Sequence, residues 1–263
     1  MDDLKSIYSE LIEGHRSWLK PFGNQYLNKW ENLLKSQLEP AICEAAARKL
    51  LSDYNIKAKP HEDISNGGPD FLCTKDGKSF YVEVTCITIE KVSQKTTLDD
   101  GSGGAQYYAL LTKVFLRELC NKTPQCSNSD KPCIAAIGTL HFRAGCCCFG
   151  KHAAEDLLTG TPKISMKFDP KQGRGVGNIY ETTDLRDSAF IRFEKTSTSL
   201  IECARNPISA VLLCNFRSSP ASAVGILHPN PNHSFDRNLL SKIEFGKLAE
   251  GCQQTDQLSV EWI

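Results

Sequence analysis

The sequence predicts an α/β fold, with a mixed central sheet flanked by helices and a helical N-terminal extension. Apolar residues recur at helical spacing along residues 1–55. Asp76-Gly77 then separates a short apolar run from a longer one, which is typical of a β-hairpin because both residues tolerate the positive φ of the turn. A helical segment at 106–119 and an apolar run at 132–140 follow. The order strand, helix, strand implies a crossover connection and therefore a parallel pair.

Residues 1–37 are predicted to form the helical extension, in which two helical runs are separated by a break at residues 20–23. The next helix opens at Pro40, because proline is favoured at a first helical position, and continues to Leu51. Its apolar face is wide, and Glu44 lies at the margin of that face. We expect Glu44 to point toward the sheet; the alternative is a solvent-exposed glutamate.

The longer apolar run after the turn is predicted to be a strand that carries a carboxylate. Side chains alternate along a strand, so Val82 and Val84 share the face expected to be core. Glu83 and Thr85 share the opposite face. A glutamate in so apolar a strand is costly to bury unless a cation compensates its charge. Since Asp70 lies on the neighbouring predicted strand, within reach of this face, the two carboxylates predict a divalent metal site.

Pro69-Asp70 and Glu83-Val84-Thr85 resemble the signature of the PD-(D/E)XK nuclease superfamily, the fold of many restriction endonucleases. That signature has Pro-Asp on one strand and Glu-x-Lys on the next. Here twelve residues separate Asp70 from Glu83, and Thr85 stands at the position of the lysine. The resemblance extends from about residue 40 to residue 240, and it implies a restriction endonuclease-like nuclease domain at residues 38–263.

The resemblance also implies a magnesium-dependent enzyme, with manganese as an equal fit for hard oxygen ligands. Asp70, Glu83 and the main-chain carbonyl of Val84 would hold the ion. Glu44 would be a further ligand from the preceding helix. Such an ion lowers the pKa of its bound water and neutralises charge on the scissile phosphate. Thr85 would hold a water through its hydroxyl group.

Family members that lack the lysine sometimes recruit one from the helix that follows the hairpin. In the segment 106–119, one stripe carries Gln106, Leu110, Lys113 and Arg117 at helical spacing. Lys113 is therefore the candidate for the displaced lysine, which would orient the nucleophile or contact the phosphate with assistance from Gln106. The alternative is that Lys113 and Arg117 form a solvated helix face.

Three further segments are predicted to complete the domain. Residues 151–158 have the character of a helix. Residues 208–214 form a continuous apolar run typical of a buried strand, and residues 223–228 are predicted to be its partner.

The segment 163–178 is rich in basic residues and glycines. Its cations are Lys163, Lys167, Lys171 and Arg174. Glycines let backbone amides approach phosphates closely, and the cations supply attraction. Because lysine plus arginine equals aspartate plus glutamate at 31 each, contact with nucleic acid has to come from such a local patch. The alternative is a flexible surface loop.

Composition predicts a cytoplasmic protein that does not enter the membrane, since no run approaches the roughly 18 apolar residues of a membrane span. The twelve cysteines are irregularly spaced, and three are adjacent at residues 146–148, which favours reduced thiols. The alternative is a zinc site from Cys120, Cys126, Cys133 and His152, although their gaps fit no known ligand spacing.

The expected function is therefore metal-dependent hydrolysis of phosphodiester bonds, with DNA as the expected partner. The alternative is a catalytically decayed module of the same fold that binds nucleic acid or a protein partner, which the threonine at position 85 makes credible. A homodimer or a place in a larger complex is compatible with either. A role in defence against foreign DNA is an expectation at the level of the family.

Overall fold

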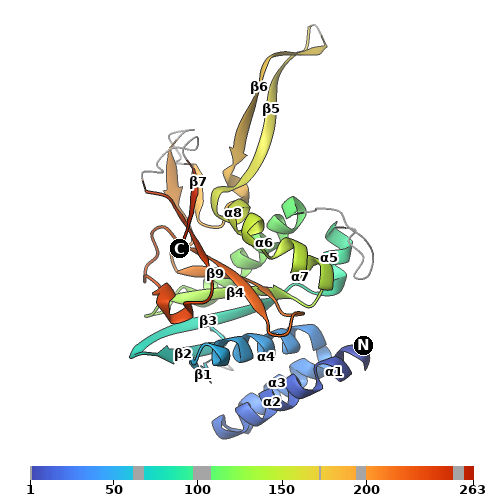
Figure 1. Ribbon diagram of the computed structural model, residues 1–263, viewed down its shortest axis with the longest axis vertical. Coiled ribbons are helices and arrows are strands. Elements are labelled where there is room, and N and C mark those ends of the chain that lie inside the picture. The colour runs from blue at the N-terminus through green and yellow to red at the C-terminus, as the bar shows by residue number, and fades with distance from the viewer. Residues whose placement is uncertain (1, 62–67, 97–107, 172, 194–199, 251–257) are drawn as a thin grey trace.

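The protein was analysed as a computed structural model that describes residues 2–61, 68–96, 108–171, 173–193, 200–250 and 258–263. Within these residues, eight strands form one mixed sheet in the order β1-β2-β3-β4-β9-β10-β11-β12 (Figure 1). Their bounds are β1 Lys57–Pro60, β2 Phe71–Lys75, β3 Lys78–Cys86, β4 Cys133–Thr139, β9 Ala210–Asn215, β10 Ser222–Leu227, β11 Phe245–Leu248 and β12 Val260–Trp262. The α/β fold with a mixed sheet between helices is thus confirmed.

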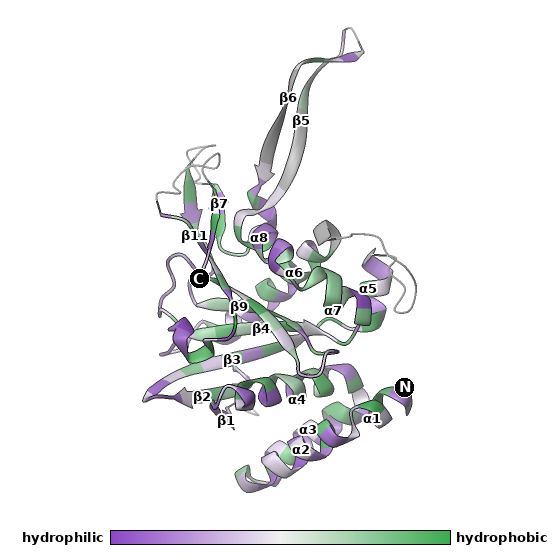
Figure 2. Cartoon of the chain, viewed as in Figure 1, coloured by the Kyte–Doolittle hydropathy of each residue, from purple (hydrophilic) through white to green (hydrophobic). Residues whose placement is uncertain are grey.

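Helices cover both faces of this sheet (Figure 1). On one side lie α1 Asp2–Ile7, α2 Ser9–Leu19, α3 Asn24–Ser36 and α4 Leu38–Asp53; on the other lie α5 Ile89–Thr96, α6 Tyr108–Cys126, α7 Phe142–Cys148 and α8 Lys151–Thr159. Hydrophobic and hydrophilic patches alternate along α2 and α3, as expected of helices that pack through one side (Figure 2). No helix in the described ranges is long and apolar enough to cross a membrane.

The predicted hairpin and crossover are confirmed. Asp76 and Gly77 have φ values of 51° and 75°, and they join β2 to β3 in an antiparallel pair. Strand β3 pairs in parallel with β4, and α6 lies in the connection between them. The apolar runs at 208–214 and 223–228 correspond to β9 and β10, which are antiparallel partners.

The core is divided into two clusters by the sheet. Val82 and Val84 belong to the cluster under α4, which also contains Trp30 and Leu34 of the N-terminal helices. Tyr81 belongs to the cluster under α6. The predicted alternation along β3 is correct, but both faces of the strand are buried rather than one.

The basic segment 163–178 is a hairpin and not the flexible loop that was the alternative. It belongs to β5 Thr161–Asp169 and β6 Arg174–Asp184, which pair in antiparallel fashion and project away from the sheet (Figure 1). A shorter hairpin is formed by β7 Ile191–Phe193 and β8 Ile201–Cys203.

The expectation of reduced thiols fails at one pair. A disulfide joins Cys126, the last residue of α6, to Cys133, the first residue of β4. The other cysteines among the described residues are free. Two of the three cysteines of the zinc alternative are therefore already bonded to each other.

His15 of α2 is fully buried between two tryptophans. Its ring centroid lies 5.0 Å from that of Trp18 and 4.6 Å from that of Trp30. Neither ring nitrogen has a hydrogen-bond partner in the described part of the chain, and Glu44 Oε1 is 3.8 Å from Nε2. Burial, and then the charge of Arg48, lower the pKa of His15 to about 3. The contact with Glu44 is therefore no ion pair at neutral pH, because the imidazole is uncharged there.

We expect the protein to lose stability as the pH falls from about 6.5 toward 3. The unfolded chain, in which His15 has its ordinary pKa of 6.5, binds a proton that the folded chain refuses down to about pH 3. Stability then decreases by up to about 1.4 kcal/mol per pH unit. Thermal unfolding followed by circular dichroism across this window measures the slope.

His15→Leu should flatten this slope, whereas His152→Leu, at a side chain that is 84 % exposed, should leave it unchanged. Some slope should remain in His15→Leu, since burial also lowers the pKa of His228, to about 4. Equal slopes for wild type and His15→Leu would contradict the assignment.

Candidate functional site

A cavity of about 510 Å³ opens at one end of the strands, where β1 and β3 end and β2 begins. Helices α3 and α4 form one wall, the β2–β3 hairpin forms the floor, and α6 contributes the other wall. Its polar and charged lining includes Lys29, Glu44, Asp70, Thr85, Glu118 and Lys122.

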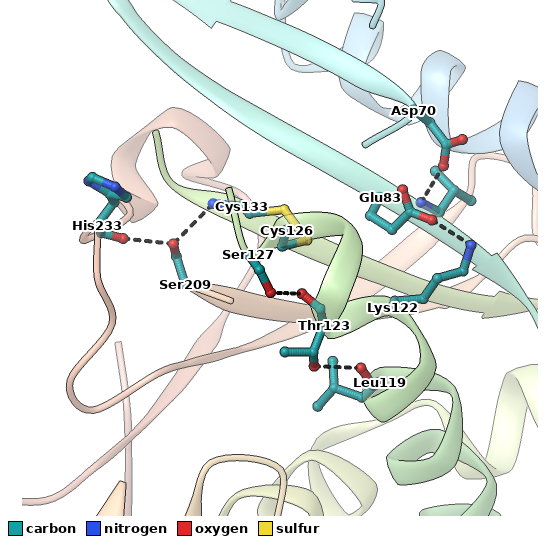
Figure 3. The surroundings of a disulfide bond; sticks show 11 residues. Asp70, Glu83, Leu119, Lys122, Thr123, Cys126, Ser127, Cys133, Ser209 and His233 are labelled. Atoms are coloured by element: carbon teal, nitrogen blue, oxygen red, sulfur yellow. Dashed lines mark hydrogen bonds and ion pairs between the residues drawn. A yellow bond between two sulfur atoms is a disulfide. The ribbon is translucent and has the colours of Figure 1, made fainter. Parts of the chain in front are cut away.

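The register of the hairpin brings Asp70 opposite Glu83. Phe71 pairs with Val82, so one further step places Asp70 across from Glu83. Asp70 Oδ2 accepts a hydrogen bond of 2.7 Å from the backbone N–H of Val84 (Figure 3). The N–H and C=O of one residue in an antiparallel ladder are directed toward the same neighbouring strand. The Val84 carbonyl is therefore directed to the same side of β3 as the Asp70 carboxylate.

Glu83 is compensated by a lysine. Its side chain is only 1 % exposed, and Lys122 Nζ lies 2.5 Å from Glu83 Oε1 (Figure 3). A buried carboxylate without a cation beside it is strongly destabilising, so this contact explains how β3 tolerates a glutamate. Glu83 does not line the cavity, whereas Lys122, which is 26 % exposed, lines it and contacts Glu83.

Lys122 replaces Lys113 as the lysine of this site. Lys113 is exposed and does not line the cavity, so its alternative reading as part of a solvated helix face is the one that fits. The two lysines are nine positions apart on α6. That is about two and a half turns, which places them on opposite sides of the helix.

Helix α6 is longer than the sequence predicts. The predicted helix ended at residue 119, whereas α6 continues to Cys126. With the longer helix, Glu118 and Lys122 stand at i and i+4 and share a face, which is the signal that would have found both cavity residues. Glu118 also forms an ion pair with Lys91. Lys29 of α3 was missed as well, because the N-terminal extension was not expected to reach the site.

The remaining predicted residues have different outcomes. Glu44 points into the cavity from α4 with its side chain 21 % exposed, and Thr85 lines the cavity while only 7 % exposed. Gln106 lies outside the described residues. Val84 and Asp70 lie together at the cavity floor, as expected.

The oxygen donors available for a hard cation are few. Among the described residues no group of three or more His, Cys, Asp or Glu side chains could hold a metal, so Glu44 does not join the two hairpin carboxylates. Asp70, Glu83 and the Val84 carbonyl are all oxygen donors. Mg²⁺ commonly keeps several waters and binds through one or two carboxylates, so these three donors fit it.

The cations predicted to contact nucleic acid lie on the β5–β6 hairpin and not at the cavity. Lys171 and Arg174 are exposed at its far end, where Arg174 pairs with Asp169 across the strands. Lys163 and Lys167 lie on β5, and their side chains are outside the described part.

We expect Lys122→Met to lower the free energy of unfolding by about 3 kcal/mol, toward the lower end for a broken buried pair because Lys122 is partly exposed. The double variant Glu83→Gln/Lys122→Met should recover much of this loss, since no buried charge is then left alone. Urea denaturation of the four proteins in this cycle measures the coupling. Lys113→Met, the matched change on the exposed side of α6, should stay within about 0.5 kcal/mol of wild type. Additive effects of the two single changes would contradict the pair.

Searches against known protein families, curated proteins and solved structures found nothing that matches this chain. The geometry of the cavity therefore carries the functional proposal.

Proposed function

We propose that the protein is a metal-dependent nuclease with a restriction endonuclease-like domain, and that it hydrolyses phosphodiester bonds in DNA. The observation that carries the proposal is that Asp70 lies opposite Glu83 and Lys122 contacts Glu83, beside a cavity at the ends of β1, β2 and β3. Two carboxylates on paired strands with a lysine next to the second are the residue types of the resembled signature. The lysine comes from α6 because Thr85 occupies its usual position.

The roles of the residues follow from their positions. Asp70, Glu83 and the Val84 carbonyl would hold Mg²⁺ or Mn²⁺, which supplies a water of lowered pKa and neutralises charge on the phosphate. Lys122 would then exchange its partner and turn its ammonium group to the attacking water or to a phosphate oxygen. Thr85 would hold a water through its hydroxyl group.

Glu44 faces this cavity from the opposite wall. A carboxylate there is placed to accept a hydrogen bond from a water on the open side of the site, and thereby to orient it. It acts in this proposal as a positioning residue rather than as a metal ligand.

The β5–β6 hairpin supports DNA as the substrate. The major groove of B-DNA admits a two-stranded β-ribbon, whereas the deep and narrow major groove of A-form RNA does not admit side chains. A projecting ribbon with four cations along its length therefore fits a DNA duplex better than an RNA duplex.

A binding module without catalysis is the second candidate, and the ion pair itself favours it. Lys122 already compensates Glu83, and Thr85 cannot serve as the missing lysine. A protein that had lost its chemistry could keep this pair for stability alone.

Cleavage assays separate the two candidates. We expect wild type to cleave plasmid DNA when Mg²⁺ or Mn²⁺ is added, and Asp70→Asn and Lys122→Gln each to lose about 100-fold or more of that rate. Lys113→Gln should cleave like wild type, since it lies on the other side of α6. Circular dichroism confirms folding of each variant. Cleavage by none of the proteins would favour the binding module, and equal rates for wild type and Asp70→Asn would place the chemistry elsewhere.

Replacement of the hairpin cations by glutamine should weaken DNA binding and its dependence on salt. The changed residues are Lys163, Lys167, Lys171 and Arg174. Each lost phosphate contact should reduce the slope of log K against log salt by about 0.9, measured by fluorescence anisotropy. A matched control removes four exposed lysines outside the hairpin, namely Lys20, Lys35, Lys113 and Lys242. If both sets changed the slope equally, the hairpin would have no special role.

A further inference from the structure

A second cavity, of about 780 Å³, lies between the N-terminal helices and the turn that joins β9 to β10. Residues of α2 and α4 form two of its walls, and residues 216–221 form the third. It shares no lining residue with the cavity beside Asp70. The volume is in the range of sites for small organic molecules, which is about 300–1,000 Å³.

Two half-buried arginines from different elements line this cavity. Arg48 comes from α4 and Arg217 from the β9–β10 turn, and neither guanidinium forms an ion pair with any described residue. Arg48 Nε is buried without a hydrogen-bond partner in the described ranges. The Arg48 guanidinium lies 5.7 Å from the centre of the Trp18 ring, a contact that holds its plane in place without using its N–H donors.

Neither acidic residue of the cavity forms an ion pair with these arginines, although the charge of Asp53 acts on Arg48 from a distance. Asp53 is engaged by Lys49, its neighbour at i−4 on α4. Glu10 is exposed at the outer margin and forms no ion pair within the described chain. Arg48 and Arg217 therefore place positive charge in a partly desolvated cavity, where an anion would be bound more strongly than at an open surface.

We propose that this cavity binds a phosphate-bearing small molecule, with the phosphate held between Arg48 and Arg217. Guanidinium groups bind phosphate through two parallel hydrogen bonds, and both Arg48 and Arg217 line the cavity. The rest of the ligand lies against Leu11, Leu50 and Phe216, since the cavity is larger than a phosphate ion needs. A nucleoside monophosphate combines such an anion with a flat aromatic ring whose faces can lie against apolar side chains.

Binding to the intact chain tests the proposal without metal or DNA. Isothermal titration with AMP, GMP, CMP and UMP, and separately with inorganic phosphate and adenosine, compares the two parts of the ligand. We expect at least one nucleotide to bind, phosphate to bind more weakly, and adenosine to bind more weakly still. Arg48→Gln and Arg217→Gln should each weaken nucleotide binding about tenfold or more.

Two controls sharpen this test. Arg143→Gln removes a half-buried arginine of α7 that lines neither of the two cavities, and it should bind like wild type. Asp70→Asn should also bind like wild type, so that failure of the nuclease proposal and failure of this one can be told apart. If Arg48→Gln does not fold, Arg217→Gln, on a turn, still decides the question.

Three results would overturn the proposal. The first is that neither phosphate nor any of the four nucleotides binds. The second is that they bind equally well to Arg217→Gln, and the third is that adenosine binds as tightly as AMP.

Discussion

The candidate site depends on one constraint, which is the burial of the Glu83 carboxylate within β3. Removed from water, that charge needs a cation beside it. The cation is Lys122 of α6, and α6 lies where it does because β3 and β4 are parallel and their connection has to cross one face of the sheet. The topology that makes the two strands parallel is thus also what brings an ammonium group to the acidic hairpin.

The parts of this arrangement that are local in sequence could be predicted from it. The Asp76-Gly77 turn fixes the register of the hairpin, and the register places Asp70 opposite Glu83. The lysine could not be placed, because its position depends on where α6 ends and on its rotation about its own axis. The sequence predicts a helix that ends at residue 119, so Lys113 is the candidate lysine there, whereas Lys122 lies in the last turns of α6 beyond that end.

The basic segment and the disulfide were hidden for different reasons. Glycines at 173, 175 and 177 have the composition of a loop, yet the strands beside them pair over most of their length, and pairing is a property of two segments rather than one. Cys126 and Cys133 are only seven residues apart, but their approach depends on α6 ending directly above the start of β4. Spacing alone does not contain that information.

Helix α4 lines both cavities. Glu44 and Arg48 stand one turn apart and line different cavities, and buried His15 lies near both: its Nε2 is 3.8 Å from Glu44 Oε1, and the charge of Arg48 contributes to its lowered pKa. Burial, however, is the larger cause of the lowered pKa of His15, so an anion that offset the charge of Arg48 would leave the imidazole buried and uncharged at neutral pH. Helix α4 thus presents a carboxylate to one cavity and a guanidinium to the other, with a neutral histidine packed beside them.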